Sequence, residues 1–313
     1  MGNESRTCLI TGGSGFQGYH LTRALLARGF KVRCLDRVKP LQLPGERYEF
    51  IEGDFSATNL LAEAIRGCDI VYHLAYTTLP QTSNDDPDFD VSSNILGTIR
   101  MMDEAVRAQA ERFIFISSGG TVYGVPQSVP IPESHPTNPT CSYGITKLTI
   151  EKYLRLYRQV HGLNTVSIRL ANPFGENQRV DSIQGVVAAF CYKALKGIPV
   201  SIWGDGTVRR DFIYIADVIE GLVAAIDAPA SGCEINIGSG RSASINELLD
   251  TIDSLVGRKV ERSYTGGRKF DVPVSELDIT LASRLLNWQP RTSLRDGLAR
   301  TLAWQEHWIA QGH

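Results

Sequence analysis

The sequence has no apolar run long enough to cross a membrane. None of its hydrophobic stretches approaches the ~20 residues that a bilayer-spanning helix needs, and the opening MGNESRTCLITGG lacks the pattern of a signal peptide. Basic residues form no block either, since 32 Lys and Arg are spread along the chain against 34 Asp and Glu. We therefore expect a cytoplasmic protein, and the charge pattern predicts neither nucleic-acid binding nor membrane binding.

Cysteine is scarce, and its spacing excludes the common metal-binding patterns. The chain has no C-x-x-C pair, and its six cysteines are Cys8, Cys34, Cys68, Cys141, Cys191 and Cys233. Most of them lie in apolar segments, which predicts buried free thiols in a reducing compartment. We expect neither a disulfide nor a metal site from this pattern.

Short apolar runs alternate with segments of helical periodicity over the first half of the chain. The strand-like runs are 7–11, 31–36, 47–54, 68–75, 112–118 and 164–171. The helical patterns are 16–30, 59–67, 94–110 and 142–160. This alternation predicts parallel strands joined by helices, and the continuously apolar strands predict helices on both faces of the sheet. The expected fold is α/β, a Rossmann-type doubly wound parallel sheet.

The alternation loosens after about residue 172, where Gly, Pro and Asn become frequent. Helical patterns recur at 185–196, 216–227, 245–256 and 294–310, and strand-like runs at 200–204 and 233–238. We expect a smaller mixed α/β C-terminal lobe. The predicted division is 1–175 for the sheet domain and 176–313 for the lobe, with about 212–240 returning to the sheet domain.

The first strand runs directly into the glycine-rich stretch TGGSGFQG. Gly12, Gly15 and Gly18 are spaced G-x-x-G-x-x-G between a predicted strand and a predicted helix, which is the context of a dinucleotide-binding loop. Gly12 permits the tight turn, Gly15 lets the backbone approach a pyrophosphate, and Gly18 allows close helix–strand packing. The helix N-terminus offers free N–H groups to the phosphates. The alternative is a glycine-rich loop with a purely structural role.

Two carboxylates follow at the ends of the next strands. Asp36 lies eighteen residues after Gly18, where a carboxylate binds a ribose 2′-hydroxyl and disfavours a 2′-phosphate. It therefore favours NAD over NADP, although Arg37 beside it could accept the phosphate. Asp54 ends the third strand and is expected either at the adenine edge or as the N-cap of the following helix.

The stretch SYGITK places Tyr143 and Lys147 four residues apart on a predicted helix, so both lie on one helix face. A neighbouring ammonium favours the phenolate and is expected to lower the tyrosine pKa, which makes Tyr143 a candidate general base. The alternative is a surface lysine beside a packing tyrosine. Hydroxyls end the strand 112–118 and follow it, at Ser117, Ser118 and Thr121. Because ligands of such sheets bind at the carboxyl ends of the strands, we expect these side chains to converge.

These motifs together resemble the extended short-chain dehydrogenase/reductase family. The matching pieces are TGGSGFQG, EGD, HLA, SSGGTVYG, SYGITK, RLANPFG, WGDGTVRRDFIYIADV, NIGSG and RKFDV, in order along nearly the whole chain. Within that family, the sequence is similar to NAD-dependent epimerases/dehydratases and most of all to UDP-hexose 4-epimerases. The resemblance implies bound NAD, a UDP-sugar substrate and a homodimer in which the helices at about 94–110 and 143–160 pair across a two-fold axis. It also makes 1–175 the NAD-binding domain and 176–313 the substrate-binding lobe.

The resemblance implies roles for individual residues. Expected cofactor contacts are Gly12, Gly15, Phe16, Gln17, Gly18, Asp36, Arg37, Asp54, Phe55, Leu74, Ala75, Asn94, Ser117, Tyr143 and Lys147. Asn94, at the start of the helix NILGT, is the least determined of these, since it can contact the cofactor or cap the helix. Expected substrate contacts are Ser118, Thr121, Asn172, Arg179, Arg210, Arg268, Asp271 and Ser275.

The substrate residues divide by the part of the ligand that they would bind. Arg210 and Arg268 are expected on the diphosphate or ribose, because guanidinium forks suit phosphates. Asn172 is expected near the sugar diphosphate or as a turn former before proline. Arg179 could pair with a sugar C6 carboxylate. Ser275, four residues after Asp271, is expected beside the sugar C2 substituent, where a small residue admits an N-acetyl group.

One position departs from the pattern of the family. Many members read S-S-S-A-T-V-Y-G and use the third serine as the catalytic hydroxyl, but this register gives Gly119 here. The hydroxyl must then come from Ser118 or Thr121, and Ser118 is preferred because it ends the strand.

Dehydratases, reductases and epimerases use this scaffold, and a non-catalytic NAD sensor is a further alternative. A 4,6-dehydratase would need a carboxyl pair where this sequence has Gly119, Gly120 and Thr121. A reductase would release its cofactor at each turnover and usually prefer NADPH, against which Asp36 argues. A non-catalytic NAD sensor would be expected to lose Tyr143 or Lys147, and both are present. The sequence therefore favours C4 epimerisation through a transient 4-keto sugar, with Tyr143 as the base.

Overall fold

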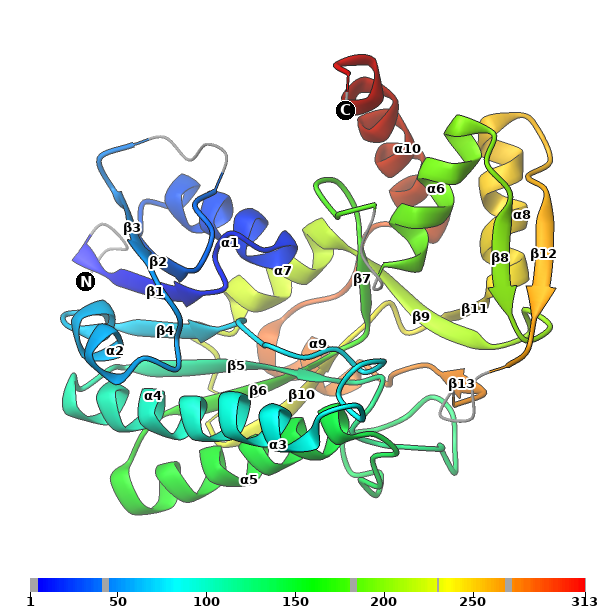
Figure 1. The fold of residues 1–313 in the computed structure, drawn as a ribbon. Helices are drawn as coiled ribbons and strands as arrows, with labels where there is room; N and C mark the ends of the chain where they lie inside the picture. The colour runs from blue at the N-terminus through cyan, green and yellow to red at the C-terminus, as the bar shows by residue number, and fades with distance from the viewer. Residues whose placement is uncertain (1–4, 41–44, 181–184, 230, 268–271, 313) are drawn as a thin grey trace.

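The computed structural model describes residues 5–40, 45–180, 185–229, 231–267 and 272–312. Its centre is a seven-stranded parallel sheet in the order β10-β6-β5-β4-β1-β2-β3 (Figure 1). The strands are β1 (Thr7–Thr11), β2 (Lys31–Asp36), β3 (Tyr48–Glu52), β4 (Ile70–His73), β5 (Arg112–Ser118), β6 (Thr165–Leu170) and β10 (Cys233–Ile237). The order reverses between β1 and β4, so the ligand crevice of such a sheet is expected beyond the carboxyl ends of these two strands. The predicted doubly wound α/β fold is confirmed.

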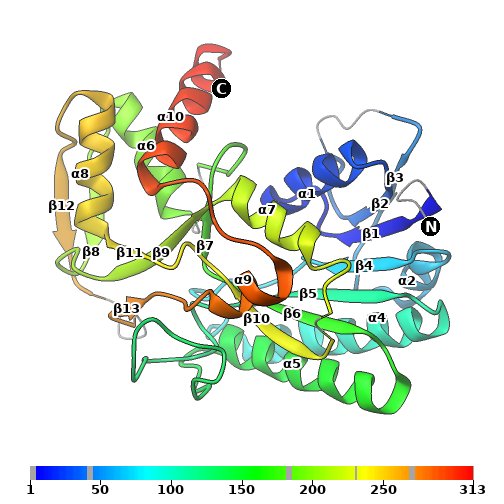
Figure 2. The same cartoon turned by 180° about the vertical axis from the view of Figure 1, so that it is seen from behind.

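Helices cover both faces of this sheet, as its apolar strands require (Figures 1 and 2). One face carries α1 (Phe16–Ala27) and α7 (Ile215–Ala224), which contact each other. The other face carries α2 (Thr58–Ile65), α4 (Leu96–Arg107) and α5 (Ser142–His161). Successive β1 residues serve the two faces in turn: Cys8 and Ile10 belong to one buried cluster, and Leu9 belongs to the other. This period of two is the geometry of a strand buried on both sides.

A second layer of shorter elements follows in the C-terminal half. Its helices are α6 (Val186–Lys196), α8 (Ile245–Val256), α9 (Thr280–Leu286) and α10 (Leu294–Ala310). Its strands are β7 (Asn172–Phe174), β8 (Val200–Trp203), β9 (Arg209–Tyr214), β11 (Ser242–Ser244), β12 (Arg262–Thr265) and β13 (Val274–Ser275). The central strand β9 pairs with β7, β11 and β13, whereas β8 and β12 form a separate parallel pair. The chain returns to the large sheet through α7 and β10, and the division into 1–175 and 176–313 stays a prediction.

The helix expected at 94–110 begins earlier than its periodicity indicates. A short helix α3 (Pro87–Asp90) leads into a π-helical turn, Val91–Ile95, which continues as α4. Asn94 therefore lies inside a helical segment, and its predicted alternative role as a helix cap is wrong. Such π turns often occur at functional sites because they redirect side chains.

All six cysteines are free thiols, as predicted. Five of them are buried, whereas Cys233 is half-exposed. Across the described ranges, no helix combines the length and the apolar character that crossing a bilayer requires.

Candidate active site

The glycine-rich loop joins β1 to α1 at the point where the strand order reverses. Gly12 has a φ of +76°, and a Cβ on it would lie 2.8 Å from the backbone nitrogen of Ala75, after β4. A Cβ on Gly18 would lie 2.2 Å from the carbonyl oxygen of Gly12. Both positions therefore need glycine, for a left-handed turn and for close packing, as predicted. Gly15 is the N-cap of α1 and no side chain caps the helix, so its first N–H groups are available to an anion.

Two predicted cofactor residues lie in the first turn of α1. Phe16 is partly buried and packs edge-on against His20, with ring centroids 5.7 Å apart. The side-chain oxygen of Gln17 is buried and has no hydrogen-bond partner among the described residues. A buried polar atom without a partner is costly, so its place beside the glycine loop indicates that a ligand completes it.

Asp36 lies at the end of β2 and its carboxylate faces the same loop. Its two oxygens accept hydrogen bonds from the backbone N–H groups of Ser14, at 3.0 Å, and Val38, at 3.2 Å. A carboxylate has further lone pairs, so Asp36 can still accept from ribose hydroxyls. Arg37 is exposed beside it.

The remaining predicted residues of the adenine side have mixed environments. One carboxylate oxygen of Asp54 accepts from the backbone N–H of Ser56, at 2.8 Å, and the N-cap of α2 is Ala57. The alternative prediction that Asp54 caps this helix is therefore wrong. Phe55 is buried against Gly97 of α4 and belongs to the core. Leu74 and Ala75 are half-buried and donate their N–H groups to the carbonyl of Thr11, at 3.2 and 3.0 Å.

Tyr143 and Lys147 lie in the first two turns of α5, as SYGITK predicts. The ammonium nitrogen of Lys147 is 5.5 Å from the centre of the Tyr143 ring and 3.8 Å from that of the Tyr76 ring. It donates to the carbonyl of Ile116 in β5, at 2.6 Å. The Tyr143 ring packs edge-on against Tyr76, with centroids 4.9 Å apart, and the Tyr143 N–H donates to the Ser83 hydroxyl, at 3.0 Å.

Burial acts against the charged form of both members of this pair. It raises the pKa of Tyr143 well above its usual 10, with smaller contributions from Cys141 and Asp90. It lowers the pKa of Lys147 from 10.5 to about 7. The expectation of a lowered tyrosine pKa is therefore wrong for the protein on its own, because burial disfavours the charged phenolate.

The hydroxyls at the end of β5 have different surroundings. The Ser117 hydroxyl is buried and donates to Glu151 of α5, at 2.6 Å, so its proton is committed inside the protein. Ser118, the next residue, is half-buried at the strand end. The Thr121 hydroxyl is buried without a partner among the described residues, and its backbone carbonyl packs against Gly144 of α5. This unpartnered hydroxyl beside the first turn of α5 favours Thr121 over Ser118 as the catalytic hydroxyl.

Gly119 has a packing reason in this fold. A Cβ there would lie 2.5 Å from a methyl carbon of Leu277 and 3.2 Å from the carbonyl oxygen of Arg169. The position at which many relatives carry a serine is therefore closed by Leu277 in this chain.

The predicted substrate residues gather around β9. In the pairing of β13 with β9, Ser275 lies opposite Arg210. Arg210 donates to the carbonyl of Val272, at 2.7 Å. Asn172 begins β7, which pairs with the later residues of β9, and it donates to the carbonyl of Asp211, at 3.1 Å. Ser275 is only 1% exposed, and its hydroxyl has no partner within the described ranges, so it is not an ordinary loop serine.

Three predicted substrate residues remain: Arg179, Arg268 and Asp271. Arg179 is exposed in the loop after β7. Arg268 and Asp271 lie outside the described residues. Of the residues predicted to bind the diphosphate and the sugar substituents, the structure brings together Asn172, Arg210 and Ser275 around β9.

Residues 8–238 match the NAD dependent epimerase/dehydratase family. The chain belongs to this family.

Relatives and solved structures of this family resemble the chain over almost its full length. A UDP-glucose 4-epimerase of Mycolicibacterium smegmatis is 36% identical over 304 residues, which cover 94% of this chain and 96% of that protein. The structure of a Thermotoga maritima UDP-glucose 4-epimerase with UDP-glucose has a TM-score of 0.92 at 31% identity and covers 97% of this chain and 99% of its own. A Bacillus cereus UDP-glucuronic acid 4-epimerase with UDP-glucuronic acid and NAD has a TM-score of 0.89 at 30% identity, with coverage of 96% and 99%.

NAD is the cofactor of this epimerase/dehydratase-family protein, and its residues fit that molecule. The glycine loop forms a cradle that a Cβ at Gly12 or Gly18 would fill. Asp36 lies at the end of β2, where its carboxylate can bind a ribose hydroxyl. The buried Gln17 oxygen has no partner among the described residues and can accept a hydrogen bond from the cofactor. The amide of Asn94 is less available, because its oxygen accepts from the Thr77 N–H, at 3.0 Å, and its NH₂ donates to Asp90, at 2.9 Å.

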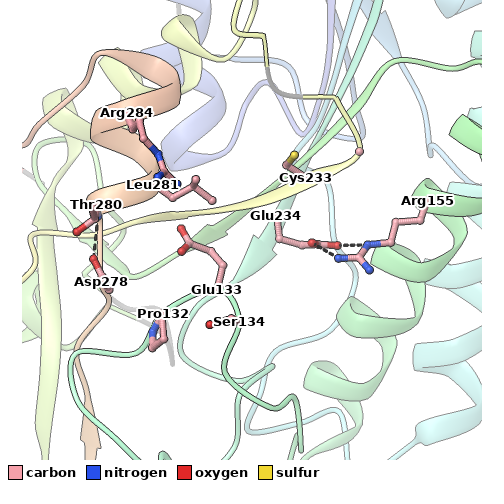
Figure 3. Close-up of a pocket in the computed structure, with 11 residues that line it drawn as sticks. Pro132, Glu133, Ser134, Arg155, Cys233, Glu234, Asp278, Thr280, Leu281 and Arg284 are labelled. Carbon is pink, nitrogen blue, oxygen red and sulfur yellow. Dashed lines mark hydrogen bonds and ion pairs between the residues drawn. The ribbon is translucent and has the colours of Figure 1, made fainter.

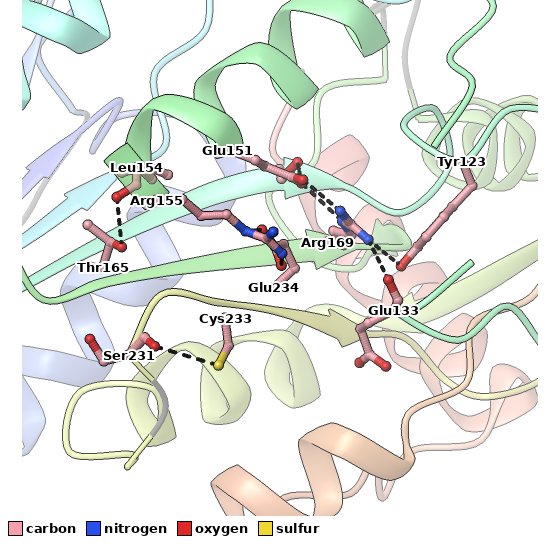
Figure 4. A network of polar contacts seen from close by, with 11 residues as sticks. Tyr123, Glu133, Glu151, Leu154, Arg155, Thr165, Arg169, Ser231, Cys233 and Glu234 are labelled. Carbon is pink, nitrogen blue, oxygen red and sulfur yellow. Dashed lines mark hydrogen bonds and ion pairs between the residues drawn. The ribbon is translucent and has the colours of Figure 1, made fainter. Parts of the chain in front are cut away.

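A buried polar network joins α5 to β6 (Figure 4). Glu151, one helical turn after Lys147, forms two hydrogen bonds with Arg169 of β6, at 2.7 and 3.0 Å, and both side chains are almost fully buried. Arg169 also donates to the Tyr123 hydroxyl and to the carbonyl of Glu133. Sequence reasoning missed Glu151, although its spacing of four from Lys147 was visible.

Asp90, Ser142 and Thr146 were missed as well. The Asp90 carboxylate is fully buried and accepts hydrogen bonds from both hydroxyls, at 2.7 and 3.1 Å. Nothing in the sequence around Asp90 distinguishes it from the exposed acids that precede it.

A separate groove of about 510 Å³ opens beside the edge strand β10 (Figure 3). Its lining includes Glu133, Asp278 and Arg284, together with the ion pair of Arg155 and Glu234. None of the predicted site residues that the structure describes lines it. The groove is therefore distinct from the candidate active site.

Proposed function

We propose that the chain catalyses NAD-dependent C4 epimerisation of a UDP-sugar through a transient 4-keto intermediate, with Tyr143 as the base. The observation that carries this proposal is that Tyr143 and Lys147 lie in the first two turns of α5, where Gly144 packs against the backbone carbonyl of Thr121. The Thr121 hydroxyl is buried and has no partner among the described residues. The similar proteins of M. smegmatis and T. maritima, both named UDP-glucose 4-epimerases, support the reaction class.

In the proposed mechanism each side chain has one task. When bound, NAD supplies the reversible oxidation and reduction of the sugar C4 carbon. The Tyr143 oxygen takes the proton of the C4 hydroxyl and returns it after the keto sugar has turned over in the pocket. Lys147 holds positive charge beside the phenol, and the Thr121 hydroxyl donates a hydrogen bond to the sugar oxygen, with Ser118 as the alternative donor.

The group around β9 is proposed to bind the rest of the substrate. Arg210 faces the diphosphate, for which a guanidinium is well suited, and Asn172 contacts the sugar diphosphate. Ser275 lies beside C2 of the sugar and leaves room for an N-acetyl group. Arg179 is proposed for the C6 carboxylate of a uronate, which the similar B. cereus enzyme carries as UDP-glucuronic acid. Arg268 and Asp271 complete the set.

We propose a homodimer built on α4 and α5. These helices lie side by side on one face of the sheet (Figure 1). Large apolar side chains are exposed on them and on the adjoining α3. The exposed residues are Phe89, Leu96, Ile145, Leu156 and Val160. Exposed apolar patches of this kind mark interfaces. Light scattering on the purified protein should give twice the chain mass, and Leu156→Glu with Val160→Glu should give a monomer; a monomeric parent would refute the dimer.

The reaction is tested by incubating the purified protein, without added cofactor, with UDP-glucose, UDP-GlcNAc, UDP-glucuronate and their C4 epimers. Products are separated by chromatography. We expect interconversion of at least one pair, and Tyr143→Phe should lower its rate by roughly 10²–10⁴-fold while NAD content stays unchanged. Activity that needs a stoichiometric reductant would indicate a reductase instead, and a Tyr143→Phe rate within a few-fold of the parent would refute the assignment of the base.

A further inference from the structure

Asp90, the last residue of α3, is a buried carboxylate with neutral partners only. It is 0% exposed and accepts hydrogen bonds from the Thr78 hydroxyl, the Asn94 amide and the hydroxyls of Ser142 and Thr146. Among the residues that the structure describes, no cation forms an ion pair with it. Because a buried charge without a counterion destabilises the fold, we expect the Asp90 carboxylate to have a role in the site.

The hydroxyl partners of Asp90 belong to the start of α5. This helix has Cys141 at its N-cap, whose side chain makes no capping hydrogen bond, and it has no acidic residue in its first turn. Two residues that precede α3 accept hydrogen bonds from the first N–H groups of α5. Asn84 accepts from the Ser142 N–H, and Ser83 accepts from the Tyr143 N–H. Asp90 adds a negative charge at the positive end of the helix dipole.

Lys147 directly follows Thr146, whose hydroxyl donates to the Asp90 carboxylate. It is 3% exposed, its nitrogen donates to the carbonyl of Ile116, and no described carboxylate lies within ion-pair distance of it. Burial is the main influence lowering its pKa, and Asp90 is the first of the two charges that oppose this. The second, Glu151, is already paired with Arg169 through two hydrogen bonds.

The other ionisable groups around Lys147 do not replace Asp90. They are His73, whose pKa burial lowers to about 3, the phenols of Tyr76 and Tyr143, and the thiol of Cys141, whose pKa values burial raises. All four are neutral at neutral pH. Asp90 is therefore the one uncompensated negative charge among the described groups that act on Lys147.

We propose that Asp90 is a positioning residue for the pair Tyr143 and Lys147. Through Ser142 and Thr146 it fixes the first turn of α5, and its charge increases the protonated fraction of Lys147 near neutral pH. The part of this inference that concerns turnover rests on the proposed function, whereas the part that concerns the charge of Lys147 does not.

The charge of Lys147 can be measured directly in the NAD-saturated protein. Lysine labelled with ¹³C at the ε-carbon reports protonation by NMR, and Lys147→Met assigns the resonance. Asp90→Asn should lower the titration midpoint of Lys147 by roughly one pH unit, because an opposite charge has been removed. Asp88→Asn is the matched control, since Asp88 lies on the same helix, carries the same charge and is exposed. A midpoint that Asp90→Asn leaves in place would overturn the proposal.

The pH profile of kcat gives the second test. Asp90→Asn should move both limbs to lower pH, since Lys147 then loses its proton earlier and Tyr143 is relieved of a neighbouring negative charge. Ser142→Ala, which removes one hydrogen bond and no charge, should lower kcat without moving the profile. A drop in kcat with an unmoved profile in Asp90→Asn would show a purely structural role and overturn the proposal. A parent that epimerises none of the sugars would refute the proposed function alone, because the NMR midpoint stands without it.

If Asp90→Asn does not fold, an NMR measurement on the parent protein still tests the coupling between Asp90 and Lys147. With ¹³C in the aspartate carboxyl groups, the Asp90 resonance must shift with the same midpoint as the Lys147 ε-carbon, since the two charges are coupled. Asp88→Asn leaves this coupling in place. Independent behaviour of the two resonances would overturn the proposal.

Discussion

Replacing Lys147 with methionine should stabilise the protein near neutral pH, and by less as the pH rises. Lys147 is 3% exposed, and burial lowers its pKa from 10.5 to about 7. The unfolded chain therefore holds this proton more tightly than the folded protein does. Between these two pKa values the folded state has released a proton that the unfolded state keeps, so the stability of the parent rises with pH.

The size of the effect follows from the two pKa values. Each pH unit between them corresponds to about 1.4 kcal/mol, so the lysine costs about 4 kcal/mol of unfolding free energy at pH 7 and about 2 kcal/mol at pH 9. Methionine has a similar shape and removes this cost. It also removes the hydrogen bond to the carbonyl of Ile116, which costs about 1–3 kcal/mol if that oxygen is left without a donor. We expect a net gain of about 1–3 kcal/mol at pH 7, and a gain smaller by about 2 kcal/mol at pH 9.

The assay is equilibrium urea unfolding of protein stripped of NAD, because bound ligand would add its own stabilisation. Parent, Lys147→Met and Lys152→Met are compared at pH 7 and pH 9. Lys152 lies on the same helix and is exposed, so its replacement should leave the unfolding free energy nearly unchanged at both pH values. A gap between parent and Lys147→Met that is the same at both pH values would refute the argument from burial.

Three further predictions concern catalysis. Lys147→Met should move the pH–rate profile upward, because Tyr143 loses its cationic neighbour; an unmoved profile would argue against coupling of the pair. Thr121→Ala should lower kcat more than Ser118→Ala, and the reverse order would return the catalytic hydroxyl to Ser118. Ser275→Tyr should reject UDP-GlcNAc relative to UDP-glucose by about 10- to 100-fold in kcat/KM, since overfilling a packed site costs about 1–3 kcal/mol; equal slowing of both sugars, against a Ser275→Ala control, would show that this residue is not the gate.

Much of the large sheet could be predicted because its strands are buried on both faces. The ranges 7–11, 31–36 and 112–118 have the same bounds in the sequence pattern and in β1, β2 and β5. In contrast, β9 (Arg209–Tyr214) was not predicted as a strand, since it opens with two arginines and an aspartate. Its stability comes from pairing with β7, β11 and β13, which are far apart along the chain. Long-range pairing of this kind leaves no local pattern.

The site shows the same division between local and long-range causes. The glycine loop was predictable because a positive φ and a close approach each select one residue type, at Gly12 and Gly18. The sign of the Tyr143 pKa shift was not, because it depends on how far α5 is buried against Tyr76 and Asp90. The π-helical turn at Asn94 escaped prediction since it keeps an ordinary helical periodicity.

Two buried acids, Glu151 and Asp90, act on Lys147 and contribute to the site in different ways. Glu151 is balanced by Arg169 and anchors α5 to β6, so it contributes rigidity with little net charge. Asp90 has hydroxyl and amide partners and forms no ion pair within the described ranges, so its charge acts on Lys147. Burial raises the pKa of Tyr143, and the pKa of Lys147 lies at about 7 even though Asp90 and Glu151 both act to raise it. A base works best when its pKa lies near the working pH. The Lys147 ammonium, which Asp90 favours, is the charge that acts on Tyr143 in this direction, because a neighbouring cation favours the phenolate.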